Sequence, residues 1–195
     1  MNVRRIASVS VAASAALALG LALSGSATAA TAASGSAVVS ESSSFFQTAA
    51  AQGVYVTPLP SATGSYSSAN GLVGTFPITA GTGSLYTATA ELQLGGGLLL
   101  VDVKTGRAAA FTKIAFDAYN DEITGVPVGG TTVVPLLDPS GDLEVEAPTA
   151  TQTFTASDLD VDPAGASYLN AHLNTTFFTA GQSVGSLAVT YTPAS

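Results

Sequence analysis

The sequence predicts an all-β domain, an antiparallel sandwich or partly closed barrel that carries two short helices. Short runs rich in Val, Leu, Ile, Thr and Phe recur about every ten residues, which is typical of all-β folds. Gly- and Pro-rich turn signals separate these runs. No long helical pattern is available to connect parallel strands, so an α/β fold is disfavoured.

Two short segments are predicted as helices. The first covers residues 40–52, with Ser40 as its N-cap, a glutamate in its first turn, an apolar stripe, and Gly53 as its end. The second covers residues 163–173, with Asp162 as its N-cap and a proline at its first position.

Strands are expected over the remaining apolar runs, and the turns between them are marked by glycine and proline. In chain order the expected strands are 38–39, 54–56, 71–79, 86–94, 98–103, 108–119, 123–128, 133–137, 152–161 and 185–192. The glycines at 95–97 are interpreted as a hairpin turn, and residues 138–141 as a type I turn. Pro77 indicates an edge strand or a bulge.

The apolar residues at alternating strand positions and on the helical stripes are the candidate core. They are Phe46, Val54, Val56, Phe76, Ile78, Leu92, Leu94, Leu99, Val101, Phe111, Ile114, Phe116, Val134, Leu136, Leu159, Val161, Leu169, Phe178, Leu187 and Val189.

The first thirty residues have the features of a secretory signal peptide. Arg4 and Arg5 precede an uncharged apolar stretch that ends in small residues. Cleavage is expected after Ala29 or Ala30, with Ala33 as the alternative. A transmembrane anchor is disfavoured because the stretch contains three serines and barely reaches the length that spans a bilayer. We therefore expect a secreted, extracellular protein: signal peptide 1–30, flexible tether 31–37 and one β-rich domain 38–195.

Composition restricts the partners. Removal of the two arginines leaves three basic against 13 acidic residues, a net charge of −10, which repels nucleic acid and anionic lipid. The chain has no cysteine, so the exported fold depends on packing without disulfides. After signal cleavage no stable membrane span is expected. A cell-envelope component or a small apolar ligand is the expected kind of partner.

The residue types of common catalytic sites are sparse. His172 is the single histidine, and it lies in the second predicted helix, where an exposed position is the ordinary interpretation. Without cysteine or a second histidine, nucleophilic catalysis and zinc binding are disfavoured. We expect no enzyme; a hydrolase that uses Asp117 and Asp121 is the remote alternative.

Asp158, Asp160 and Asp162 form the most distinctive polar pattern. At alternate positions on a strand, neighbouring members start about 6.6 Å apart on one face, and such oxygen-rich faces can bind Ca²⁺. The alternative is a solvated strand face that keeps a sheet edge soluble, with Asp162 capping the helix. These three aspartates are the metal-site candidates.

Two short motifs, GTFPITAG at residues 74–81 and FFTAG at 177–181, resemble secreted actinobacterial β-rich proteins of the HtaA type. The resemblance implies a β-rich domain with a short helix near its start, and the best-known members bind haem. The family's tyrosine ligand follows the pattern S-F-x-x-Y, but Thr48 stands at that position here. The family's supporting histidine precedes a glycine-leucine turn, where this chain has Leu94. Tyr55 and Tyr86 are the substitute candidates for a cofactor ligand, and no cofactor is expected.

These observations favour a secreted, non-enzymatic structural or interaction module. The alternative is an extracellular binding protein for haem or another apolar or planar small ligand.

Overall fold

The computed structural model describes residues 31–67, 71–147 and 150–195, so the expected signal peptide lies outside the described residues. The described elements are β1 (Ser34–Glu41), α1 (Ser43–Gln52), β2 (Val54–Leu59), β3 (Thr63–Ser67), β4 (Gly71–Thr82), β5 (Glu91–Asp102), β6 (Arg107–Asp117), β7 (Glu122–Pro127), β8 (Val134–Glu146), β9 (Gln152–Val161), α2 (Pro163–Leu173) and β10 (Ser183–Thr192). Within these ranges no helix combines the length and the apolar character needed to cross a membrane.

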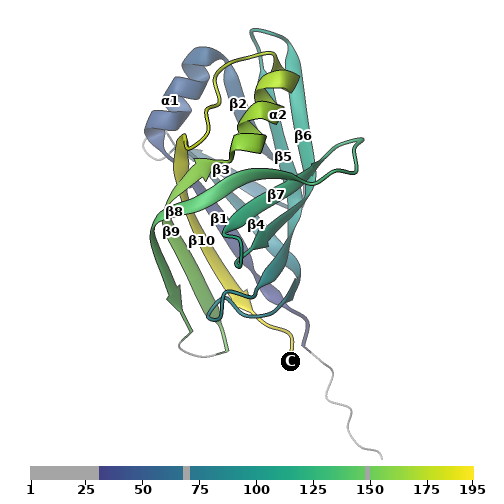
Figure 1. The fold of residues 1–195 in the computed structure, drawn as a ribbon, viewed down its shortest axis with the longest axis vertical. Coiled ribbons are helices and arrows are strands. Elements are labelled where there is room, and N and C mark those ends of the chain that lie inside the picture. Colours follow the sequence, from purple (N-terminus) through teal and green to yellow (C-terminus); the bar gives the residue numbers. More distant parts are fainter. Residues whose placement is uncertain (1–30, 68–70, 148–149) are drawn as a thin grey trace, which may run out of the picture.

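Eight antiparallel strands close into a barrel (Figure 1). The sheet runs from β5 through β6, β7, β8, β9, β10 and β1 to β4, and β4 pairs again with β5. Two extra strands extend it, because β2 pairs with β5 and β3 pairs with β4. The predicted all-β class with two short helices is confirmed, and of the two predicted architectures the barrel is the observed one.

The glycines at 95–97 lie inside β5, so the predicted hairpin turn is wrong. Residues 91–94 of β5 pair with β4, whereas residues 97–102 pair with β2, so the glycines mark the point where β5 changes its partner. Neighbouring chains approach closely here. A Cβ on Gly96 would lie 2.6 Å from the Ala62 nitrogen, and one on Gly97 would collide with the Phe111 carbonyl oxygen. Glycine is required here for close approach.

The predicted type I turn at 138–141 is also wrong, because β8 continues through it. The register with β9 shifts between Ser140 and Leu143, and Gly141 adopts a positive φ of 73°. The Asp-Pro-Ser-Gly segment therefore forms a bulge, which bends the strand without reversing it. Pairing with β9 on both sides of the bulge overrides the local turn preference.

Both helices form where the sequence predicts them, and their caps explain their limits. Asp162 accepts hydrogen bonds from the backbone N–H groups of Ala164 and Gly165 at the start of α2. Gly53 ends α1 in the left-handed conformation. The N-cap of α1 is Ser42, however, and not Ser40, so β1 extends two residues further at its C-terminal end than predicted. One of these two residues is Glu41.

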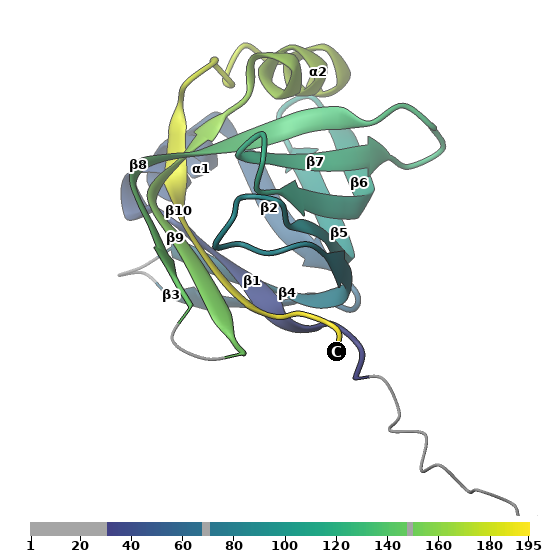
Figure 2. The ribbon, with the colours of Figure 1, turned by 60° about the horizontal axis from the view of Figure 1, so that its bottom comes forward.

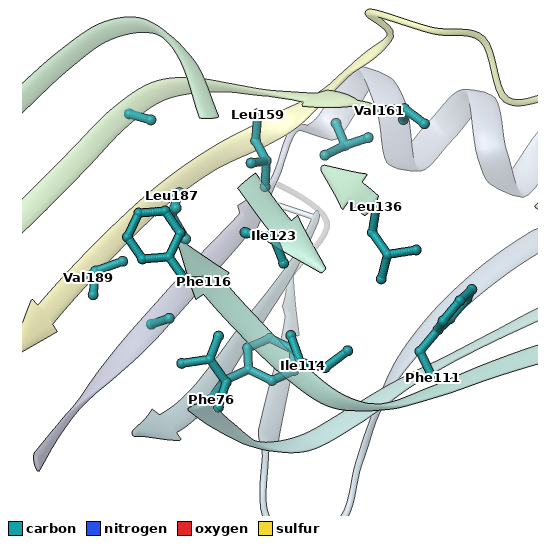
Figure 3. Close-up of a cluster of buried hydrophobic side chains, with 14 of the residues drawn as sticks. Phe76, Phe111, Ile114, Phe116, Ile123, Leu136, Leu159, Val161, Leu187 and Val189 are labelled. Atoms are coloured by element: carbon teal, nitrogen blue, oxygen red, sulfur yellow. The ribbon is translucent and has the colours of Figure 1, made fainter. Parts of the chain in front are cut away.

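Most of the predicted core is buried (Figure 3). Phe46, Val56, Leu99 and Val101 are the exceptions, since each is only half-buried. The inward-facing side chains of β5 are at even positions, including Leu100, because the strand continues through the glycines, so Leu99 and Val101 lie on its other face. On α1 the buried ring is Phe45, while Phe46 packs on exposed Tyr66 at a centroid distance of 4.7 Å.

Part of the expected tether belongs to the barrel. Residues 34–37 pair with residues 189–192 of β10, and Ala37 is completely buried. The predicted tether is therefore wrong for these four residues, whose small side chains suit close strand packing. The expected strand 86–94 begins only at Glu91, and β3 had no strong sequence pattern to predict it.

Candidate functional site

A cavity of about 110 Å³ lies inside the barrel. Residues of nine strands and both helices line it, so it occupies the axis of the fold. The wall is almost entirely aliphatic and aromatic. Its rings are Phe45, Phe76, Phe111, Phe116 and Phe178. Packed protein interiors rarely contain a void of this size, so the cavity needs an explanation.

Among the described residues that line the cavity, Glu41 alone has a polar side chain. It is the last residue of β1, where Ala37, Val39 and Glu41 alternate inward and all line the cavity. Oε2 of Glu41 accepts the backbone N–H of Leu72 at 3.3 Å. Burial raises the pKa of Glu41 to about 7, although the hydrogen bond from Leu72 lowers it. The carboxyl group is thus partly protonated at neutral pH.

The barrel wall beside Glu41 contains a seam without ladder hydrogen bonds. β2 and β3 are the two ends of the sheet order and do not pair with each other. Pro58 of β2 packs over β3 and β4, where a Cβ on Gly64 or Gly74 would lie 3.1 or 3.6 Å from its Cγ. Pro58 and Leu72 both line the cavity.

Both helices lie at one end of the barrel, at the top of Figure 1 and from another side in Figure 2. Aromatic contacts close this end. The Phe45 ring of α1 lies 5.6 Å from the Phe177 ring, which follows α2. Phe177 in turn packs against Phe178 at 4.9 Å. Because Phe45 and Phe178 also line the cavity, these rings form its end wall.

The substitute tyrosine ligands do not reach the cavity. Tyr55 lies on the outer face of β2 and is 44% exposed, and Tyr86, in the turn between β4 and β5, is 69% exposed. Neither residue lines the cavity. Thr48 lies exposed on α1, where its hydroxyl donates to the Ser44 carbonyl at 2.8 Å. Leu94 is buried and lines the cavity.

Each of the three candidate calcium ligands has a different partner. Asp158 accepts from the Ser183 hydroxyl, Asp160 accepts from the Ser140 hydroxyl at 2.8 Å, and Asp162 caps α2. Burial and the negative charges of Asp162 and Asp160 raise the pKa of Asp138. Among the described residues, no group of three His, Cys, Asp or Glu side chains is arranged to hold a metal ion.

The remaining candidates have structural surroundings. His172 is exposed near the end of α2, where its ring stacks on Tyr168 at 3.8 Å. Asp117 accepts the N–H groups of Tyr119 and Asn120 at the turn after β6. Burial raises the pKa of Asp117, but these two hydrogen bonds and one from the Asn120 side chain have the larger combined effect. The pKa of Asp117 therefore lies below its ordinary value. Burial and the charge of Asp117 raise the pKa of Asp121.

A second, wider pocket of about 560 Å³ lies outside the barrel, where β1 meets α1 beside β9 and β10. It is lined mainly by serines and includes Asp158 and also Glu41, which therefore borders both pockets. Several of its polar groups already have partners: the Ser183 hydroxyl donates to Asp158, and the Asp142 N–H donates to Ser157 Oγ at 2.8 Å. The interior cavity is therefore the stronger candidate site.

Comparison with solved structures agrees with this architecture. The C-terminal domain of HtaA from Corynebacterium glutamicum superposes with a TM-score of 0.57 at 14% identity, over 85% of this chain and 99% of that domain. The chain has the fold of that domain. The haem-binding protein HtaB of the same organism gives a TM-score of 0.48 at 12% identity, over 84% of this chain and 94% of HtaB. The chain matches no protein-family model and no curated protein sequence.

The HtaA resemblance seen in two short motifs is therefore confirmed at the level of fold. The sequence did not single out Glu41 as a site residue, because its position next to the first helix suggested an ordinary helix-start glutamate. Its alternation with Ala37 and Val39 was the available signal, and it becomes informative only when the strand is known to continue to residue 41.

Proposed function

We propose that this chain is an exported, non-enzymatic binding protein that holds a small apolar molecule inside its barrel. The observation that carries the proposal is the interior cavity, whose described lining residues have apolar side chains except for Glu41. A purely structural module, which the composition also suggests, gives this cavity no role. Water gains little in such a space, since it needs polar partners that the wall does not offer.

The volume sets the size of the ligand. An engineered apolar cavity of about 150 Å³ in another protein stays dry and binds benzene. At about 110 Å³, this cavity suits a short alkyl chain or a small ring. Burial of six carbons at about 0.8 kcal/mol each gives about 5 kcal/mol before the cost of association. Because the cost of association reduces this gain, we expect a dissociation constant of about a millimolar or higher for such a probe.

Haem fits these residues poorly, although the fold is similar to that of an HtaA domain. The two positions that would carry the family's tyrosine and histidine hold Thr48 and Leu94, and neither side chain can ligate iron. The cavity is also smaller than one that binds benzene, so a porphyrin does not fit inside the barrel. A smaller apolar ligand is the better match.

Parallel titrations test this proposal. We expect 1-hexanol and benzene to bind the purified protein saturably by calorimetry, with heats that fit one site. We expect haemin titrated under the same conditions to show no saturable shift of its Soret band. Saturable haemin binding without any binding of 1-hexanol or benzene would overturn the proposal in favour of a haem protein.

A further inference from the structure

The carboxyl group of Glu41 gives the cavity a chemical preference. The other lining residues offer only apolar side-chain surface, so a ligand inside has one side chain with which to form a polar contact. One oxygen of Glu41 accepts the Leu72 N–H. A carboxylate has about four acceptor positions, so most of its hydrogen-bonding capacity is left for a ligand.

Glu41 has no counter-charge in the described part of the chain. In the described part of the chain, the interaction shown for its side chain is the hydrogen bond from Leu72, and no cation contributes to its pKa. The basic residues Lys104, Arg107 and Lys113 are exposed, and the Lys104 ammonium group donates to the Ala51 carbonyl at 2.9 Å. An unpaired carboxylate beside apolar side chains is costly, and a cationic ligand would remove that cost.

We infer that the cavity takes a short aliphatic amine, with its alkyl chain between the apolar side chains and its ammonium group donating to the Glu41 carboxylate. This inference rests on the proposed function, because it assigns the chemical class of the molecule held in the same cavity. The strongly acidic chain also attracts cations and repels anions at a distance. An ammonium group carries three donors, which suits a carboxylate with free acceptor positions.

The other simple classes of ligand complement the site less well. A fatty acid would bring a second carboxyl group beside Glu41, and the two negative charges would repel each other. An alkane would fill the apolar volume but leave the carboxylate with the Leu72 N–H as its one hydrogen-bond donor in the described part of the chain. An alcohol would supply one neutral donor, and it therefore serves as the reference compound.

The test is a calorimetric series on the purified full-length chain at pH 8, with n-hexylamine, 1-hexanol and hexanoate as probes. A charge-assisted hydrogen bond is about twice as strong as a neutral one, so we expect n-hexylamine to bind at least about tenfold more tightly than 1-hexanol. Hexanoate should bind at least about tenfold more weakly than 1-hexanol. In Glu41→Gln, n-hexylamine should fall to the level of 1-hexanol.

Glu91→Gln is the matched control, since Glu91 is an exposed carboxylate of β5 outside the cavity wall. It should leave all three affinities unchanged. A readout that needs no variant is the NMR titration of the Glu41 carboxyl carbon, whose apparent pKa should fall when n-hexylamine saturates the protein.

The outcomes separate this inference from the proposed function. If 1-hexanol binds but n-hexylamine is no tighter, or if the Glu41 signal does not respond to the amine, the amine preference is overturned and the apolar site stands. If no compound of the series binds, the proposed function itself is overturned.

Discussion

Glu41 Oε2 accepts the backbone N–H of Leu72 at 3.3 Å, across the ends of β1 and β4. This bond fixes a carboxyl group at the wall of an otherwise apolar cavity. It only partly compensates the loss of water around that group, so the pKa of Glu41 is still raised, to about 7. The position and pKa of Glu41 therefore bear on both the pH dependence of stability and the kind of ligand that the cavity can hold.

The first prediction concerns Glu41→Gln and the pH dependence of stability. An unfolded glutamate titrates near 4.5, so between pH 4.5 and 7 the folded state keeps a proton that the unfolded state has released. The contribution of Glu41 to the free energy of unfolding therefore falls as pH rises through this window. The Glu41→Gln variant lacks this pH-dependent loss of stability. Its free energy of unfolding at pH 8 should be about 1–2 kcal/mol higher than that of wild type, allowing for solvent screening. At pH 4 the two should be equal.

Urea unfolding of both proteins at pH 4, 6 and 8 measures this difference. The comparison cancels the contributions of Asp121, Glu122 and Asp138, whose pKa values are also raised. A difference that stays constant across pH would show that Glu41 does not titrate in this range.

The second prediction concerns Gly97→Ala in β5. An added Cβ would collide with the Phe111 carbonyl oxygen of the neighbouring strand, so the two strands must move apart. We expect a loss of about 2–3 kcal/mol in the free energy of unfolding. Gly130→Ala is the control, because its nearest neighbour, the Pro127 carbonyl oxygen, is 3.3 Å from an added Cβ and the change should cost less than about 0.5 kcal/mol. Equal losses in both variants would contradict the role of the glycines as the point of partner exchange.

The third prediction concerns the N-cap of α2. Asp162→Ala removes the acceptor for the Ala164 and Gly165 N–H groups and should destabilise the protein by about 1 kcal/mol in thermal or urea unfolding. Asp162→Asn keeps a capping oxygen while it removes the charge next to Asp138, so it should retain nearly full stability. If both variants lose the same stability, the carboxylate charge matters more than the cap.

The fourth prediction concerns export. Expression of the full chain in a secreting bacterial host should release a processed protein into the medium. N-terminal sequencing should place its first residue at Ala30 or Thr31, with Ser34 as the alternative. A protein that retains Met1 and stays with the membrane fraction would contradict the signal-peptide assignment.

The elements that the sequence predicted well are those governed by local chemistry. Gly53 ends α1 and Asp162 begins α2 because capping involves only neighbouring residues. The sequence located each barrel strand at least in part, although β5 starts later than predicted. Runs of β-branched and aromatic residues indicate strands, and such runs are also local features.

The features that it missed depend on strands far apart in the chain. The glycines at 95–97 signal a turn in isolation, but they are strand residues once β2 and β4 both pair with β5. Residues 138–141 became a bulge because β9 pairs on both sides of them. The cavity, and with it the role of Glu41, arises from how eight strands close around one axis, which no single segment specifies.

The most direct test of a ligand site inside the barrel is the binding of 1-hexanol to Val39→Phe, measured by calorimetry beside Val38→Phe. Val39 lines the cavity, whereas its neighbour Val38 belongs to the opposite face of β1 and does not line it. Filling the cavity with the larger ring should abolish binding in Val39→Phe, and Val38→Phe should bind like wild type. Undiminished binding in a folded Val39→Phe variant would place the ligand elsewhere and contradict this account.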